Sequence, residues 1–252
     1  MEAGGRVGIV GDGRVALHMK YYWTQQGLRI SQWSRRRELG GGGSPKETLT
    51  GCSSVFVALK DSVIEEWILN HQAGLPGVRF FHFSGSLQTP LALGLHPLST
   101  FGTKLYSLEE YRALPFVCEK GCPSIAAILP GLNNPQFEIR PEDKPFYHAL
   151  CVLSGNFTVL LWQKIFSEFE VRLGIPASVA RPYLGRITKN LTDEWKSALT
   201  GPIQRSDVQT LRGNLEALSG DEYSSIFRSF VETFVPQFKE SLVGETLIKE
   251  TL

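Results

Sequence analysis

The chain has 252 residues, which suits one large domain or two modest ones. Hydrophobic residues make up 42% and charged residues 20%, as in an ordinary soluble globular protein. The formal net charge is +1 without a long basic or acidic run, so we expect neither a nucleic-acid partner nor an anionic membrane surface.

The first predicted element is an apolar strand at residues 6–10. The short Gly-rich start before it lacks the apolar stretch of a signal peptide, so we expect a cytoplasmic protein. The pattern G-x-G-x-x-A follows, with Gly11 for a tight turn, Gly13 for close approach of a diphosphate and Ala16 for close packing of a helix. We expect the turn and the helix N-terminus to bind a dinucleotide. The predicted contacts are Gly11, Asp12, Gly13, Arg14 and Val15.

The second predicted strand, residues 28–33, ends in Ser34 and three arginines. NAD-binding proteins usually place a carboxylate there to accept hydrogen bonds from the ribose hydroxyls. Here Arg35 or Arg36 could pair with a 2′-phosphate and stack on adenine, while Ser34 donates a hydrogen bond. The pattern therefore favours NADP(H) over NAD, although a solvated basic turn has the same composition.

Strand-like and helical runs continue to alternate up to about residue 140, which predicts a parallel sheet with right-handed crossovers. We assign residues 1–140 to a Rossmann-type α/β domain that binds NADP. Cys118 and Cys122 are four residues apart without a second pair or a nearby His, so we expect free thiols and no metal. The later predicted strands are residues 54–59, 79–83 and 116–119, and the first helices are residues 15–26 and 62–71.

After residue 140 the pattern is helical, and we assign residues 141–252 to a helical domain for substrate binding and dimerisation. Its first helix is predicted at residues 145–173, ending at Gly174. Apolar residues line most of its circumference but polar ones interrupt it, so we expect a buried central helix rather than a membrane span. Further helices are predicted at residues 177–190, 193–199, 208–218, 221–234 and 236–249, with Thr192, Asp207 and Ser219 as N-caps.

Several later segments together resemble a known group. They are Leu59-Lys60-Asp61, His82-Phe-Ser84-Gly-Ser86, His96-Pro-Leu-Ser-Thr100-Phe101, Tyr147-His148-Ala149 with Asn156, and Gly201-Pro-Ile-Gln-Arg205-Ser-Asp207. The chain is similar to Rossmann-like proteins with a C-terminal helical domain of unknown function, which are provisionally assigned as NADP oxidoreductases. More distantly it resembles pyrroline-5-carboxylate reductase, ketopantoate reductase and the β-hydroxyacid dehydrogenases.

The resemblance implies a helical domain like the C-terminal domain of 6-phosphogluconate dehydrogenase, and a homodimer built on the helical halves. It also implies that the nicotinamide lies between the sheet's C-terminal edge and the helical domain. Leu59, Lys60 and Ser84 are further expected cofactor contacts.

The expected chemistry is hydride transfer with a side chain that supplies or removes a proton. His82 follows an apolar strand and could donate a proton near neutral pH, or could be a structural histidine. His96 begins a predicted loop that could cover the site and bind substrate, or could belong to a rigid turn. Arg205 could bind a substrate carboxylate, and Asp207 is placed with it, although an ion pair and a helix cap are equally good explanations.

His148 and Asn156 lie eight residues apart on the long predicted helix, about 80° apart around its axis. Both could therefore face one cleft, and we name them with His82 as catalytic candidates. In β-hydroxyacid dehydrogenases a catalytic lysine precedes the asparagine by four residues, and here that position is Val152.

The expected function is hydride transfer between NADP(H) and a small carboxylated imine or carbonyl compound. Because valine cannot transfer a proton, a non-catalytic NADP(H)-binding sensor or regulatory protein is the alternative.

Overall fold

The structure is a computed structural model that describes residues 5–238. Two compact units divide the chain after Leu161. The long helix begins close to the predicted domain boundary at residue 140, and the division between the units falls inside this helix.

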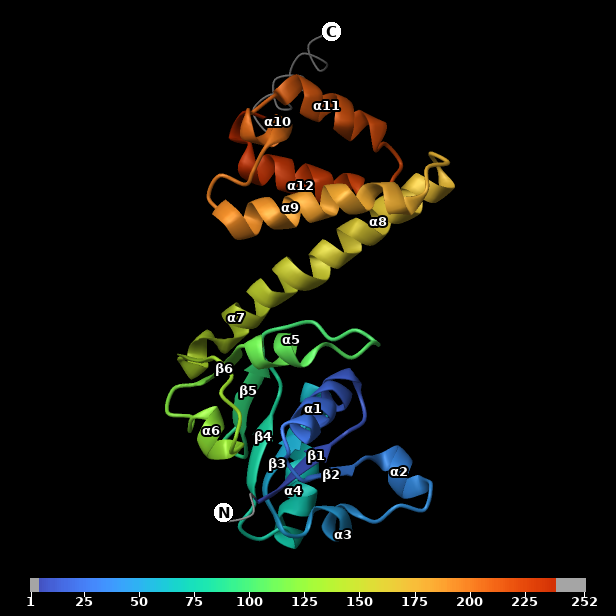
Figure 1. Ribbon diagram of the computed structural model, residues 1–252. Helices are drawn as coiled ribbons and strands as arrows, with labels where there is room; N and C mark the ends of the chain where they lie inside the picture. The colour runs from blue at the N-terminus through green and yellow to red at the C-terminus, as the bar shows by residue number, and fades with distance from the viewer. Residues whose placement is uncertain (1–4, 239–252) are drawn as a thin grey trace. The chain divides into compact units, whose positions relative to one another are not determined.

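The N-terminal unit is built on one seven-stranded sheet in the order β2-β1-β3-β4-β5-β6-β7 (Figure 1). The first five strands in this order run parallel, β6 is antiparallel to β5, and β7 is parallel to β6. The predicted α/β class with a Rossmann-type sheet is confirmed. The strands are β1 (Arg6–Val10), β2 (Ile30–Trp33), β3 (Cys52–Val57), β4 (Arg79–His82), β5 (Leu93–Pro97), β6 (Phe116–Glu119) and β7 (Gln136–Ile139).

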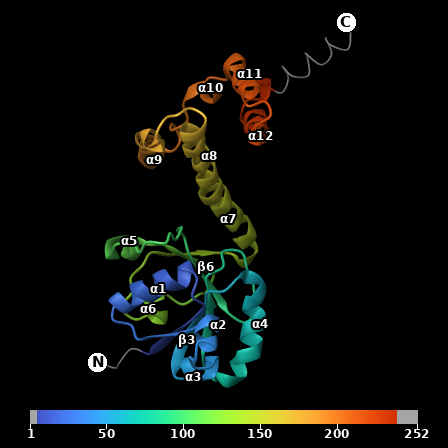
Figure 2. The same ribbon diagram turned by 90° about the vertical axis from the view of Figure 1, so that its right-hand side faces the viewer.

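Helices cover both faces of this sheet, with α1 and α4 on opposite sides (Figure 2). The alternation of side chains along β3 accounts for the two layers, because Phe56 packs with the α1 side while Val55 and Val57 pack with the α4 side. The helices of this layer structure are α1 (Arg14–Gln25), α2 (Arg35–Leu39), α3 (Pro45–Leu49), α4 (Asp61–His71), α5 (Leu108–Ala113) and α6 (Ile125–Ile128).

Two of the seven strands were not predicted. β5 is short and contains Gly94 and Pro97, residues that usually interrupt strands. The expected loop at His96 is therefore wrong: His96 pairs with Val117 of β6, and Pro97 is tolerated because it ends the strand. β7 has only four residues, two of them polar, and none of them is fully buried, which hid it from the sequence pattern.

A helical run from Pro141 to Val171 leads out of the sheet. It consists of η2 (Pro141–Asp143), α7 (Lys144–Cys151), the π-helical segment η3 (Val152–Phe157) and α8 (Thr158–Val171). Among the described helices, this run is long and apolar enough to cross a membrane. Its most apolar stretch is not buried against other parts of the chain. The prediction of a buried central helix is therefore wrong for the single chain.

The second unit is helical and is described by itself. Asp207 caps α11 as predicted, accepting a hydrogen bond from Thr210 N–H, and Leu211, Val231 and Val235 form the buried centre. The predicted helix at 193–199 is wrong, because α9 runs through Thr192, which is therefore not a cap. Ser219 is not a cap either, since α12 begins after Tyr223; the predicted helix 236–249 lies mostly outside the described residues. The helices are η4 (Ala177–Ala180), α9 (Arg181–Glu194), α10 (Gly201–Gln204), α11 (Val208–Ala217) and α12 (Ser224–Phe234).

Candidate functional site

The turn between β1 and α1 is shaped by two glycines with different tasks. Gly11 has φ +112°, and a Cβ built on it would lie 2.5 Å from the carbonyl oxygen of Ala58. Only glycine fits there. Gly13 has an ordinary φ of −70°, and no described atom lies within 4 Å of a Cβ built on it. The open space beside Gly13 thus lies where α1 begins, and Gly13 has no side chain with which to cap the helix. The turn fits a diphosphate group.

The end of β2 is tied to this turn by Asp12. Ser34 caps α2 by accepting from Arg37 N–H, and its hydroxyl donates to Asp12 Oδ2 at 3.1 Å. Arg36 Nε lies 2.9 Å from the same oxygen, and the Arg36 side chain is 82% exposed. Two of the groups predicted to bind a 2′-phosphate are therefore already paired with a carboxylate.

A groove of about 970 Å³ runs along these residues, which we call the dinucleotide groove. Trp33 and Trp67 form an apolar wall on it, with their ring centroids 5.7 Å apart. The groove is lined by eight of the predicted cofactor contacts: Gly11, Asp12, Gly13, Ser34, Arg35, Arg36, Leu59 and Lys60.

A second hollow of about 320 Å³ shares Gly13, Ala58 and Leu59 with the groove, and we call it the histidine cleft. The two hollows therefore border the same turn. The remaining predicted residues on the cleft are Arg14, Val15, Ser84, His96 and His148, and Asp61 and Gly85 also line it.

Two histidines meet in this cleft. The rings of His96 and His148 are nearly perpendicular, with centroids 6.0 Å apart. A Cβ built on Gly85 would lie 2.6 Å from His148 Cδ2 and 3.2 Å from His96 Nε2, so the absence of a side chain at Gly85 makes room for the pair. Tyr147 Oη lies 2.7 Å from His96 Nδ1. Burial, aided by the nearby His148 and Lys144, lowers the pKa of His96 to about 4.

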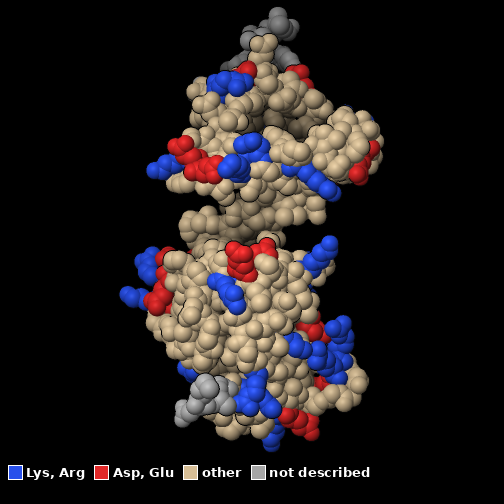
Figure 3. All heavy atoms as spheres, viewed as in Figure 1, with Lys and Arg blue, Asp and Glu red and all other residues tan. Residues whose placement is uncertain are grey.

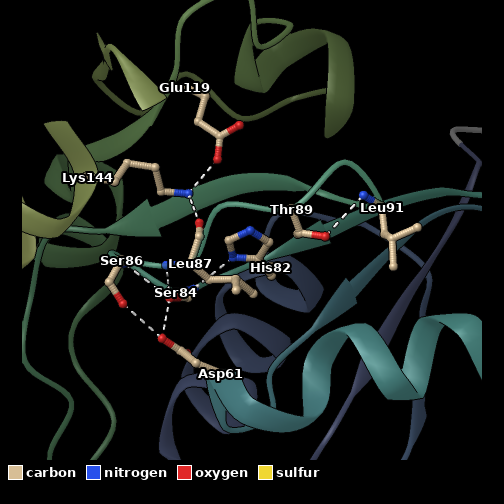
Figure 4. Close-up of polar contacts among 9 residues, drawn as sticks. All are labelled: Asp61, His82, Ser84, Ser86, Leu87, Thr89, Leu91, Glu119 and Lys144. Atoms are coloured by element: carbon tan, nitrogen blue, oxygen red, sulfur yellow. Dashed lines mark hydrogen bonds and ion pairs between the residues drawn. The ribbon is translucent and has the colours of Figure 1, made fainter. Parts of the chain in front are cut away.

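The turn between β4 and β5 is held from two sides (Figure 4). Asp61, at the start of α4, accepts hydrogen bonds from the hydroxyls of Ser84 at 2.6 Å and Ser86 at 3.1 Å. On the other side the buried Lys144 donates to the carbonyl oxygen of Leu87 and pairs with Glu119. Lys144 thereby fixes the first turn of α7, from which Tyr147 and His148 reach the cleft.

His82 does not line the cleft. It is fully buried at the end of β4, and its Nδ1 accepts a hydrogen bond from Ser84 N–H at 3.2 Å. Burial, aided by the charge of Lys144, lowers the pKa of His82 to about 4. His82 therefore supports the turn that carries Ser84, which favours the structural alternative over a proton donor near neutral pH.

Asn156 also lies outside the cleft lining, and its side chain is exposed. The expected angle of about 80° assumed a regular α-helix, whereas Asn156 lies in the π-helical segment η3, where the turn is wider. Arg205 and Asp207 belong to the other unit, where Arg205 ends α10 and Asp207 caps α11.

Three residues of the site were not singled out as site residues from the sequence: Asp61, Lys144 and Tyr147. Asp61 and Tyr147 stood inside quoted motifs, next to Lys60 and His148, which was a usable signal. Lys144 is a single lysine before a proline, and the sequence gave no signal that it belongs to the site. In residues 5–238, no group of three or more His, Cys, Asp or Glu is arranged to hold a metal, and the four cysteines are free thiols.

The face shown in Figure 3 is mostly uncharged, with charged side chains in scattered groups. In Figure 3, basic and acidic side chains are interspersed on the face shown, and neither sign forms one continuous field. The basic residues that matter for the site are therefore the local ones, Arg35 and Arg36 at the groove.

Residues 118–233 match a family described as a domain of unknown function, DUF2520. No curated protein matches the sequence.

Solved structures share the fold over nearly the whole chain. A proposed NADP oxidoreductase from Bacteroides fragilis is 20% identical, with a TM-score of 0.77 over 92% of this chain and 98% of that one. An imine reductase from Streptomyces aurantiacus is 13% identical, with a TM-score of 0.62 over 91% and 93%. Pyrroline carboxylate reductase from Plasmodium falciparum, solved with NADP bound, is 12% identical, with a TM-score of 0.57 over 94% and 98%.

Proposed function

We propose that this protein binds NADP(H) in the dinucleotide groove and is an oxidoreductase that acts on a small carboxylated carbonyl or imine compound in the histidine cleft. One observation carries the proposal: the two hollows share Gly13, Ala58 and Leu59 in their linings, at the turn that fits a diphosphate. A ligand that lies along the groove with its diphosphate at the turn reaches the histidines with its other end.

The fold comparisons support this assignment. Proteins named as NADP oxidoreductase, imine reductase and pyrroline carboxylate reductase share the architecture. The open side of Gly13 and the start of α1 fit a diphosphate, and the arginines at the end of β2 fit a 2′-phosphate.

When bound, NADPH supplies a hydride to an electrophilic carbon. The chain's own residues then have three tasks. The β1–α1 turn and Arg35–Arg36 hold the cofactor, the Asp61–Ser84 contact fixes one wall of the cleft, and His148 supplies the proton that completes the reduction. Arg205 and Asp207, which belong to the other unit, are kept from the sequence as candidate substrate-binding residues, and Asn156 is kept from the sequence as a catalytic candidate. An Arg205→Ala variant should raise KM for an acidic substrate and leave NADPH affinity unchanged.

The direct test has two stages. NADPH titration should quench tryptophan fluorescence and raise Tm, since Trp33 and Trp67 line the groove. NADPH oxidation is then screened with carbonyl and imine acids, comparing the native protein with His148→Ala. Turnover that depends on His148 supports the enzyme. Binding without turnover on a broad panel supports the non-catalytic sensor, and no binding refutes both.

We also propose that the protein is cytoplasmic and forms a homodimer, and the exposed apolar residues of the helical run support the homodimer. Sedimentation should show a dimer, and Leu153→Glu should give monomers. Membrane association of the native chain in vesicle flotation would contradict the proposal. The large side chains concerned are Phe146, Leu150, Leu153, Phe157, Val159 and Leu160.

A further inference from the structure

His96 is held by one strong neighbour. Its Nδ1 lies 2.7 Å from Tyr147 Oη, and the two rings meet edge to face at 82° with centroids 5.5 Å apart. Tyr147 lies on α7 three residues after Lys144, which fixes the start of that helix to Glu119 of β6. The distance between His96 and Tyr147 is therefore set by the sheet on one side and the anchored helix on the other.

The direction of this hydrogen bond follows from the neighbours of Tyr147. Its hydroxyl lies 2.7 Å from His96 Nδ1. The thiol of Cys151 is its other polar neighbour and helps to raise the pKa of Tyr147. An imidazole nitrogen is a strong acceptor and thiol sulfur a weak one, so the hydroxyl donates to Nδ1. Desolvation by burial raises the pKa of Tyr147, which keeps the proton on its oxygen. In neutral His96 the ring proton is then on Nε2.

Nε2 is the atom that faces the histidine cleft. It lies 3.2 Å from a Cβ built on Gly85, and His96 is part of the cleft lining. Among residues 5–238, the structure shows no hydrogen-bond partner for Nε2. A ligand in the cleft therefore meets an N–H group of fixed direction.

The surroundings keep this ring neutral. His148 and Lys144 on α7 oppose a positive charge on His96, and so does burial, while Asp61 on α4 favours it. The buried His82 on β4 is a further titratable neighbour, and Tyr147 on α7 contacts the ring directly. The balance leaves the pKa of His96 at about 4, so the ring is uncharged at neutral pH.

We propose that His96 is a catalytic hydrogen-bond donor whose Nε2–H, oriented by Tyr147, binds the oxygen of a substrate carbonyl. The proposal rests on the proposed function and narrows it, because a protonated imine presents N–H rather than a lone pair and cannot accept this bond. Hydride adds to the carbonyl carbon, the C=O π electrons move to oxygen, and the alkoxide takes its proton from His148. His96 keeps its own proton and stabilises the developing charge, as expected of a donor aimed at an oxyanion.

The test reads the tautomer directly. The full chain is labelled with ¹⁵N-histidine, and His96 is assigned among the five histidines with a His96→Gln variant. Between pH 5.5 and 8 the spectrum should show neutral His96 with a proton on Nε2 and none on Nδ1. Tyr147→Phe should mix the two tautomers while keeping the ring packing. A protonated Nδ1 in the native protein at pH 7 would overturn the proposal.

The functional arm uses pyruvate as a carbonyl probe with NADP⁺ present. The Nε2–H resonance should shift on addition of pyruvate to the native protein, and the absence of a shift at saturating NADP⁺ would refute the role. With a carbonyl substrate from the screen, His96→Leu should lower kcat by about 100-fold and His96→Gln, which keeps an N–H donor, by less. If the protein binds NADPH but His96 carries its proton on Nδ1, only this inference is overturned. If the protein does not bind NADPH, the proposed function is overturned as well.

Discussion

The dinucleotide groove and the histidine cleft adjoin each other but are built differently. The groove takes charged groups from the β1–α1 turn, the end of β2 and the segment that begins α4, and Arg36 on it is largely exposed. The cleft combines residues from β5, the β4–β5 turn and α7 that are far apart in sequence, and its histidine His96 is held neutral by burial. The groove is thus suited to binding a charged ligand in solvent, and the cleft to polarising a small group away from water.

The largest expected effect separates binding from stability at the groove. Gly13→Ala should weaken NADPH binding by about 100-fold, or about 3 kcal/mol, because the new methyl group occupies the space that the diphosphate needs. Tm should stay within a degree or two, since no described atom lies near that position. Calorimetric titration and thermal melting measure both quantities.

Gly213→Ala is a matched control in the middle of α11, where a Cβ also meets no described atom. It should leave NADPH affinity unchanged and stabilise its helix by about 0.5–1 kcal/mol. Unchanged NADPH affinity in Gly13→Ala would show that the turn does not contact the cofactor.

The second prediction concerns the choice of cofactor. The double variant Arg35→Ala and Arg36→Ala should weaken NADPH binding by about 10- to 100-fold, because hydrogen bonds between charged groups contribute about 1.5–3 kcal/mol. NADH binding should change little. Arg37→Ala on the same short helix is the control, since Arg37 does not line the groove. Equal losses for both cofactors would contradict the assignment to NADP(H).

The third prediction is that the stability of the protein depends on pH because of the buried His82 beside the histidine cleft. His82 has a folded-state pKa of about 4, below its ordinary value of 6.5, so the unfolded chain takes up the proton first. Its stabilising contribution is complete above pH 6.5 and is lost as pH falls toward 4. Between pH 6.5 and 5 the free energy of unfolding should fall by roughly 1–2 kcal/mol from this group.

Urea denaturation at several pH values measures this slope, with tryptophan fluorescence as the signal. His82→Gln should flatten it in part, because His96 contributes with the same sign. His71→Gln, at the rim of the groove, serves as the control. A slope that is the same in His82→Gln and the native protein would show that His82 is not buried as a neutral ring.

The same contrast explains what could be predicted from the sequence. The β1–α1 turn is local, and the roles of Gly11 and Gly13 follow from the steric needs of one crossover. The pairing of His96 with Tyr147 depends on β5, whose Gly94 and Pro97 conceal it as a strand, and on the place where Lys144 anchors α7. The sequence does not distinguish His82 from His96. The two differ in how deeply their side chains are buried, since His82 is fully buried and His96 is half-buried. The π-helical segment that turns Asn156 away has no local signature.

The smallest expected effect concerns Asp12 in the dinucleotide groove. The sequence pattern did not reveal that this carboxylate pairs with groups expected to bind the 2′-phosphate. Asp12 accepts from both Ser34 and Arg36, so a bound 2′-phosphate must compete with its carboxylate for the same groups. Asp12→Asn keeps an acceptor oxygen for Ser34 and removes the negative charge. Because the ion pair is largely exposed, its loss changes the balance by less than about 1 kcal/mol, and NADPH affinity should rise about threefold. The gain should shrink at high salt, as expected for a screened charge. A fall in NADPH affinity would mean instead that Asp12 orients Arg36 for the phosphate, and that the pairing assists binding.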